Sequence, residues 1–321
     1  MELQQIDVKQ NSVKSDKFFT KTFVVWVGAL ICCLLWGSAF PSIKIGYSLF
    51  QIPSSQISSQ ILFAGIRFFL AGILTIVIGS LTKRKILYPK KQSWVKVLKL
   101  STFQTIGQYI FFYIGLAFTT GVRGSIVEGT NVFVSIFIAS LIFHQEKLTN
   151  RKLIGTLIGF SGVVLINLSG NSLGGEGLLW LGDLLVFAST FCYGISSVLL
   201  KRYSVVEDPV MMSGYQFLIG GFIMTIIGLI GGGTLPVVTG QGIALLIYLG
   251  FVSAVAYSLW GILLKYNPIS KVSVFGFMNP VFGVILSAIF LKEGSVLNLI
   301  SLVALILTAT GIFIVNKQKE E

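Results

Sequence analysis

The chain has 321 residues, of which 54% are hydrophobic and 11% are charged, and its mean hydropathy is +0.86. This composition excludes an ordinary soluble globular domain. A net charge of +12 would favour nucleic-acid binding in a soluble protein. Here, however, the Lys and Arg residues lie in short segments between long apolar runs, where positive charge governs the insertion of membrane helices. We therefore expect an integral membrane protein without a nucleic-acid partner.

The apolar runs predict an all-α protein with ten transmembrane helices. The first run, Phe23 to Ile43, contains no charge and is long enough to cross a hydrocarbon layer of roughly 30 Å. Helix ends placed at charges, Gly and Pro give predicted spans at 23–43, 60–82, 94–118, 123–143, 151–169, 177–200, 211–231, 241–264, 270–291 and 296–316. Residues 1–22 and 317–321 form polar tails.

The basic residues favour one orientation of these spans. Most of the 24 Lys and Arg residues lie in the N-terminal tail, in every second connection and after the last span. Since cytoplasmic loops are enriched in Lys and Arg, both termini are expected in the cytoplasm. The expected location is the cell membrane.

The two halves of the sequence are related. A shift of 148 residues aligns polar residues in the same order, namely Tyr109 with Tyr257, Arg123 with Lys271, Ser125 with Ser273 and Asn131 with Asn279. A shift of 157 aligns Trp36 with Tyr193 and Lys44 with Lys201. Because five is an odd number, a second five-helix unit enters the bilayer from the opposite face. The sequence therefore predicts inverted repeats at 23–169 and 177–316, an arrangement typical of transporters.

Short motifs in both halves resemble those of the drug/metabolite transporter (DMT) superfamily, EamA type. These motifs are Leu35 to Phe40 in the first span, Arg67 to Ala71 in the second, Gly182 to Leu185 in the sixth, and Asn279 to Phe282 with Leu291 to Glu293 in and after the ninth. The resemblance implies that spans one, three, four, six, eight and nine surround a cavity, that spans five and ten are peripheral, and that export is common.

Glu128 is the leading candidate for a binding residue. It lies more than one turn into the fourth span, on a stripe with Ser125, Val132, Ser135 and Ala139. An ionisable group at this depth is costly and usually functional. A carboxylate facing a cavity can pair with a substrate amine or carry a proton. The alternative is an ion pair with Arg123 or Lys44 near the outer surface.

Other polar and aromatic residues within the spans complete the predicted lining. Gln104 and Gln108 lie one turn apart and can offer donors and acceptors to a polar solute, or bond between helices. The repeat-related Asn131 and Asn279 belong to the same set. An aromatic lining that can hold apolar groups or a cation is predicted from Trp36, Tyr109, Tyr193, Tyr257 and Trp260, although ordinary packing explains each of them singly.

Five further residues are interpreted as hinge or packing positions. Arg67 and Asp183 are expected to fix helix packing or to extend toward the outer surface rather than to touch substrate. Gly276, Pro280 and Gly283 form a stripe of small residues that allows close approach or lines a cavity, and Pro280 can mark a hinge. Cys32, Cys33 and Cys192 lie within apolar runs without metal-site spacing, so neither a metal nor a cofactor is expected.

These features predict a secondary active transporter and not an enzyme. The expected cargo is a small metabolite such as an amino acid or an amphipathic or cationic compound, exported by alternating access and coupled to protons through Glu128. One alternative is a nucleotide-sugar or phosphate-ester antiporter, which needs a basic site. Another is a membrane-embedded transferase using His144 with Glu146. The expected partners are a small-molecule substrate and the lipid bilayer. The sequence does not decide whether the chain forms a homodimer.

Overall fold

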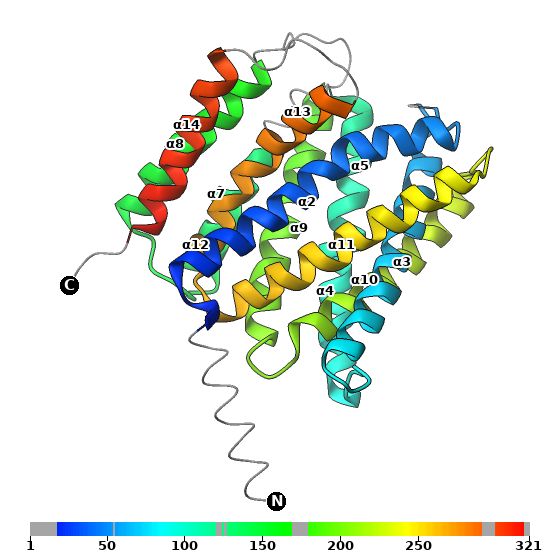
Figure 1. The fold of residues 1–321 in the computed structure, drawn as a ribbon, viewed down its shortest axis with the longest axis horizontal. Coiled ribbons are helices and arrows are strands. Elements are labelled where there is room, and N and C mark those ends of the chain that lie inside the picture. The colour runs from blue at the N-terminus through cyan, green and yellow to red at the C-terminus, as the bar shows by residue number, and fades with distance from the viewer. Residues whose placement is uncertain are drawn as a thin grey trace, which may run out of the picture.

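A computed structural model of the chain describes residues 18–53, 55–119, 124, 127–168, 179–290 and 299–317. Every regular element in these ranges is a helix (Figure 1). The all-α prediction is therefore confirmed for this part of the chain.

The helices follow the predicted apolar runs. In chain order they are α2 (Thr22–Leu49), α3 (Ile57–Thr82), α4 (Trp94–Ser101), α5 (Gln108–Phe118), α7 (Asn131–Phe137), α8 (Asn150–Leu168), α9 (Leu179–Tyr203), α10 (Pro209–Ile230), α11 (Gly240–Tyr266), α12 (Ile269–Ser273), α13 (Met278–Phe290) and α14 (Leu299–Asn316). Three of the predicted spans change helix type within the described residues, and one of these changes is the π-helical stretch at Ile138–Ile142 that follows α7. A π-helical stretch at Thr102–Gly107 joins α4 to α5, and a 3-10 stretch at Val274–Phe277 joins α12 to α13.

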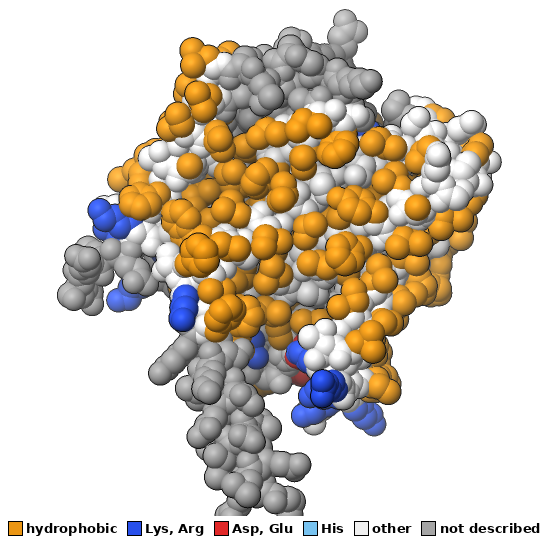
Figure 2. All heavy atoms as spheres, in the orientation of Figure 1, with side chains coloured by type: hydrophobic (Ala, Val, Ile, Leu, Met, Phe, Trp, Pro, Cys, Tyr) orange, Lys and Arg blue, Asp and Glu red, His pale blue; other side chains and the backbone are white. Residues whose placement is uncertain are grey.

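Several helices have membrane dimensions. The helices α2, α3, α9, α10 and α11 are each long and apolar enough to cross a bilayer. Figure 2 shows one face of the molecule covered with hydrophobic side chains over most of its height, with Lys and Arg gathered toward its lower end. Large apolar side chains such as Leu34, Phe222 and Phe251 are exposed. A surface of this kind is stable when hydrocarbon, and not water, surrounds it.

The most extensive helix packing joins the first half of the chain to the second. α3 packs along α10, α8 along α14, α5 along α9, and α2 along both α11 and α13. Figure 1 shows α8 and α14 side by side at one end of the bundle.

Glycine makes the closest of these approaches possible. A Cβ placed on Gly221 of α10 would lie 2.2 Å from the backbone N of Phe69 in α3. Gly37 of α2 lies equally tightly against α13, because its Cβ would be 2.5 Å from Cβ of Phe282. Small residues let membrane helices approach until their backbones touch, so dispersion contacts accumulate along the whole interface.

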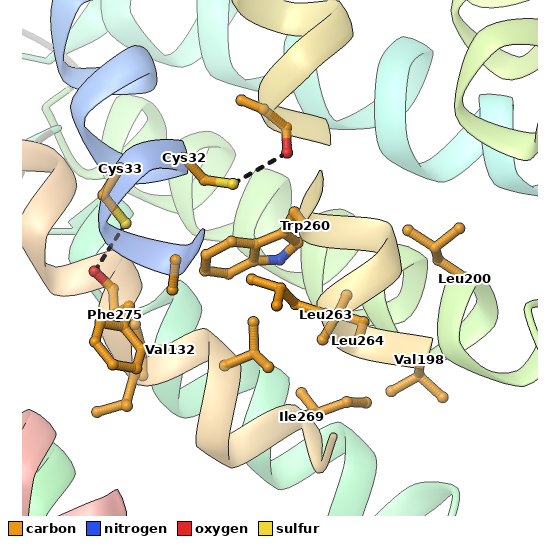
Figure 3. Close-up of a cluster of buried hydrophobic side chains, with 14 of the residues drawn as sticks. Cys32, Cys33, Val132, Val198, Leu200, Trp260, Leu263, Leu264, Ile269 and Phe275 are labelled. Atoms are coloured by element: carbon orange, nitrogen blue, oxygen red, sulfur yellow. Dashed lines mark hydrogen bonds between the residues drawn. The ribbon is translucent and has the colours of Figure 1, made fainter. Parts of the chain in front are cut away.

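The cysteines pack between the halves. Cys32 and Cys33 on α2 are fully buried. The Cys32 thiol donates to the carbonyl oxygen of Ala256 at 3.3 Å, and the Cys33 thiol donates to that of Phe275 at 3.1 Å (Figure 3). Both contacts agree with the interpretation of these cysteines as small packing residues with a weak donor.

Candidate functional site

Two tyrosines meet in the interior of the bundle. Tyr109 on α5 and Tyr257 on α11 share a hydrogen bond of 2.9 Å between their hydroxyl oxygens. The ring of Tyr109 also contacts Phe68 of α3, with 4.4 Å between the ring centroids. Residues from three helices, which come from both halves of the chain, therefore surround this hydrogen bond. It connects two of the aromatic residues predicted for the lining.

Trp36 and Trp260 extend the same aromatic cluster. Trp36 on α2 lies edge-on to Tyr257 and to Trp260, with a centroid distance of 5.0 Å to each ring. Trp260 is only 1% exposed and belongs to the main hydrophobic core (Figure 3). Neither indole N–H has a hydrogen-bond partner among the described residues. Trp260 is thus placed as a packing residue, whereas Trp36 lies between the core and the tyrosine pair.

Glu128 is held by uncharged groups at the N-terminal end of the helical segment that leads into α7. Ser189 on α9 donates its hydroxyl to Oε2 of Glu128 at 3.4 Å, and the Asn131 side chain also hydrogen-bonds the carboxyl group. Tyr109 and Tyr193 lie within electrostatic reach of it. Four predicted lining residues are therefore neighbours. The alternative partner Arg123 lies outside the described residues.

The repeat-related segments of the two halves face each other here. Gly276, the counterpart of Glu128, lies against the start of α7, where an added Cβ would be 3.4 Å from Cγ2 of Val132 and 3.8 Å from Oδ1 of Asn131. The Oδ1 atom of Asn279, the counterpart of Asn131, is buried without a hydrogen-bond partner among the described residues. Where the first half carries the Glu128 carboxylate, the second half thus has a glycine, Gly276, and three residues later the Oδ1 acceptor of Asn279.

The two glutamines are buried on the third span. Gln104 lies in the π-helical stretch and is 1% exposed, and Gln108 begins α5. The Oε1 atom of each lacks a hydrogen-bond partner within the described ranges. A buried acceptor without a partner costs free energy, about 1 to 3 kcal/mol in mutational series, so both amides are open to water or to a solute.

Arg67 lies deeper than the sequence suggested. Because α3 begins at Ile57 and not at residue 60, Arg67 lies nearly three turns into the helix, and it is only 4% exposed. Its Nη2 donates to Oγ of Ser253 at 3.4 Å, and its guanidinium lies 4.5 Å from the ring centroid of Phe68. The side chain therefore does not extend outward. A charge at such depth costs about 2.5 to 3.5 kcal/mol on insertion scales.

Three residues predicted as hinge or packing positions lie where helices contact or follow one another, namely Asp183, Gly283 and Pro280. Asp183 accepts a hydrogen bond of 2.6 Å from the Thr119 hydroxyl, which ties the start of α9 to the end of α5. Gly283 lies against the ring of Phe40 in α2. Pro280 is in the first turn of α13, directly after the 3-10 stretch, so its missing N–H removes the bond that a continuous α-helix would make to Gly276. The helix type changes just before Pro280, in the 3-10 stretch.

A groove of about 410 Å³ lies between α7 and α9 on the outside of this cluster. Its lining is apolar and includes Phe133, Val134, Phe137, Phe187 and Phe191. None of the predicted substrate-binding residues lines it. The polar cluster around Glu128 is therefore separate from this groove.

Sequence reasoning missed three polar neighbours of the site. Ser189 contacts Glu128, Ser253 contacts Arg67, and Tyr47 lies within electrostatic reach of Arg67. Ser189 and Tyr193 are four residues apart on one helix, and this spacing was a usable signal. Ser253 lies four residues before Tyr257 on α11 and carries the same signal. Tyr47 carries none, and it lies near Arg67 because the end of α2 contacts Phe63 of α3.

The basic end of the bundle is closed by contacts between the halves. Glu146 accepts hydrogen bonds from the backbone N of Ser270 at 3.0 Å and from its hydroxyl at 2.7 Å, and it pairs with Lys152 at 3.1 Å. Lys201 donates to the carbonyl oxygen of Asn267. These contacts give Glu146 a structural role. The transferase alternative, in which His144 acts together with Glu146, thereby loses one of its two residues.

A family model of known proteins matches the chain over residues 24–168 and again over 180–317, and its description is "EamA-like transporter family". The chain belongs to this family. It is accordingly a multi-pass membrane protein of the DMT superfamily, and the family and its named relatives are transporters rather than enzymes.

Relatives come from bacteria, archaea and plants. The uncharacterized transporter YvbV of Bacillus subtilis is 27% identical over 294 residues, covering 89% of this chain and 90% of that protein. An uncharacterized transporter of Archaeoglobus fulgidus is 25% identical over 290 residues, covering 90% and 96%. A chloroplastic WAT1-related protein of Arabidopsis thaliana is 25% identical and covers 92% of this chain and 70% of its own length.

A solved crystal structure has the same fold. It aligns with a TM-score of 0.73 and 17% sequence identity over 90% of this chain and 95% of the other. At this identity the match carries the fold alone.

Proposed function

We propose that the chain is a secondary active transporter with ten transmembrane helices, built as two inverted five-helix repeats that alternate access to one central site. The packing of the helices supports this. When each helix is replaced by its counterpart in the other half, the packed pair α5–α9 becomes the packed pair α11–α2. The packed pairs α3–α10 and α8–α14 are converted into themselves. The hydrogen-bonded Tyr109 and Tyr257 are separated by the repeat shift of 148 residues. A pseudo-twofold axis through that bond accounts for both observations.

The orientation follows from the charges. The first residues of α2 and the last residues of α14 lie toward the same end of the bundle (Figure 1). This is also the end where Lys271 donates to the carbonyl oxygen of Thr20 and Arg151 donates to that of Lys317. The positive-inside rule then supports a cell membrane location with both termini in the cytoplasm.

The cargo we propose is a small metabolite that carries an amine, such as an amino acid or an amphipathic cation, and the direction is export. The observation behind it is the placement of Glu128. Its carboxyl group accepts hydrogen bonds from neutral side chains and lies within electrostatic reach of Tyr109 and Tyr193, surroundings in which a cationic group can bind. In the absence of cargo the same carboxyl group can take up a proton, which provides the coupling.

Transport by purified protein in proteoliposomes tests this proposal. We expect amine uptake that is driven by a proton gradient in the wild type and loses that dependence in Glu128→Gln, since the amide can neither ionise nor carry a proton. Glu207→Gln is the matched control, because Glu207 is a carboxylate paired with Lys96 outside the membrane spans. Gradient-driven uptake that is unchanged in Glu128→Gln would refute the coupling role.

The alternative cargo is a nucleotide sugar or a phosphate ester carried by antiport, and the scarcity of buried basic residues apart from Arg67 among the described residues counts against it. A phosphate group carries up to two charges and is normally held by several basic side chains. Within the described spans only Arg67 provides a deeply buried cation near the tyrosine pair. Counterflow with a phosphate ester in the same proteoliposomes distinguishes the two cargo classes.

A further inference from the structure

Arg67 has more hydrogen-bonding capacity than the protein uses. Of its five N–H donors, one makes the long 3.4 Å bond to Ser253, and Nε makes none with the residues that the structure describes. The ion pairs formed among those residues involve Lys83, Lys96 and Lys152, so Arg67 has no carboxylate partner in this part of the chain. A guanidinium with this burial normally has its charge balanced.

The surroundings of Arg67 include three tyrosines, one of which also reaches Glu128. Tyr47, Tyr109 and Tyr257 all lie within electrostatic reach of the guanidinium. Tyr109 is simultaneously within reach of Glu128. Tyr109 therefore links the surroundings of a buried cation on α3 to those of the carboxyl group that precedes α7.

We infer that Arg67 binds an acidic group of the cargo, so that the site recognises a solute carrying a carboxylate and an amine together. This inference rests on the proposed function, with Glu128 holding the amine. The planar guanidinium can donate two parallel hydrogen bonds to a carboxylate, and the ring of Trp36, which is only partly buried, contacts the apolar part of the solute. The bound zwitterion neutralises both protein charges, which neither a simple amine nor a simple acid does.

Thermal unfolding of the full chain in detergent, with matched solutes, tests this inference. The probes are leucine, phenylalanine and tryptophan, each compared with its carboxamide and its decarboxylated amine. We expect the acids to stabilise the wild type at concentrations roughly 10- to 100-fold lower than the amides, because a charge-assisted pair is lost in the amide. Equal effects of acid and amide overturn the inference and need no variant.

Three variants separate recognition from folding. Arg67→Gln is expected to abolish the preference for the acid, and Arg67→Lys to retain part of it, since the charge remains but the paired geometry is lost. Ser253→Ala removes the protein's own partner of Arg67 and is expected to retain the preference. Full preference in Arg67→Gln or Arg67→Lys contradicts the inference.

The outcomes also separate this inference from the proposed function. Stabilisation by the amines that depends on Glu128, without any advantage for the acids, overturns the role of Arg67 and leaves the amine transporter standing. Failure of all three solute classes overturns both the role of Arg67 and the proposed cargo class.

Discussion

At the scale of single residues, the interior of the protein contrasts satisfied and unsatisfied polar groups. Tyr109 and Tyr257 satisfy each other, whereas Gln104, Gln108 and Asn279 each have an oxygen without a partner in the described ranges. Free energy is lost wherever a buried polar atom lacks a bond, and such atoms persist where water or a ligand supplies it. Other buried polar atoms without a partner among the described residues, such as those of Gln145, Ser204 and Asn316, lie elsewhere in the bundle, so a missing partner alone does not mark the binding site.

The tyrosine pair gives a prediction for stability. Tyr109→Phe leaves the Tyr257 hydroxyl buried and unpaired, so we expect a loss of about 1 to 3 kcal/mol in the free energy of unfolding. Tyr257→Phe is expected to act alike, and the double variant to cost clearly less than the sum of the two. Denaturant unfolding of all four proteins in detergent measures this coupling. Strictly additive losses would show that the bond contributes nothing.

At the scale of helices, apolar length and charge predicted the elements well, and their irregularities poorly. α11 ends within two residues of its predicted span, because Lys265 and Asn267 mark the boundary in the sequence. α2 continues through Pro41 and Lys44 to Leu49, since packing against α11 and α13 supports the extra turns. The 3-10 stretch at Val274–Phe277 lies one turn before Pro280, the residue predicted as a hinge, whereas the π-helical stretch at Thr102–Gly107 follows no proline and was not predicted.

The α3–α10 interface gives a prediction at this scale. Gly221→Ala forces a methyl group to within 2.2 Å of the Phe69 backbone N, so the two helices must separate. We expect a loss of about 1 to 3 kcal/mol, as for other overpacked interfaces, with a lower Tm. Gly240→Ala is the matched control, since nothing lies within 4 Å of a Cβ there at the start of α11. Equal Tm values for the two variants would contradict the interpretation.

At the scale of the whole molecule, sequence reasoning identified the family, and it predicted site residues without being able to place them relative to one another. The repeat shift foretold that Tyr109 and Tyr257 are counterparts, and only the fold brings their hydroxyls together. Arg67 was expected to fix helix packing or to extend outward, and only the packing of α11 against α3, which brings Ser253 to it, shows that it points inward. Contacts such as Glu146 with Ser270 join residues 124 positions apart, and no local pattern encodes them.

The basic end of the molecule responds to acid in a predictable direction. Burial acts to raise the pKa of Glu207, but hydrogen bonds from Lys96 and Ser93 outweigh it and hold that pKa below its ordinary value. The folded state therefore gains stability above the ordinary carboxyl pKa of about 4.5 and loses it as pH falls through the lower folded-state value. We expect Tm in detergent to fall on acidification below about pH 4.5, and to fall less in Glu207→Gln.

The packing of α3 with α10 and of α8 with α14 has a consequence for the history of such chains. Each of these helices has its main neighbour in the opposite half, so a polypeptide ending after α8 would leave its broadest interfaces bare. Two separately synthesised fragments, 1–170 and 171–321, would have to find one another in the bilayer to become stable. With the inverted repeats proposed above, an ancestor with only one of the halves would have had to assemble with a second copy inserted the other way up.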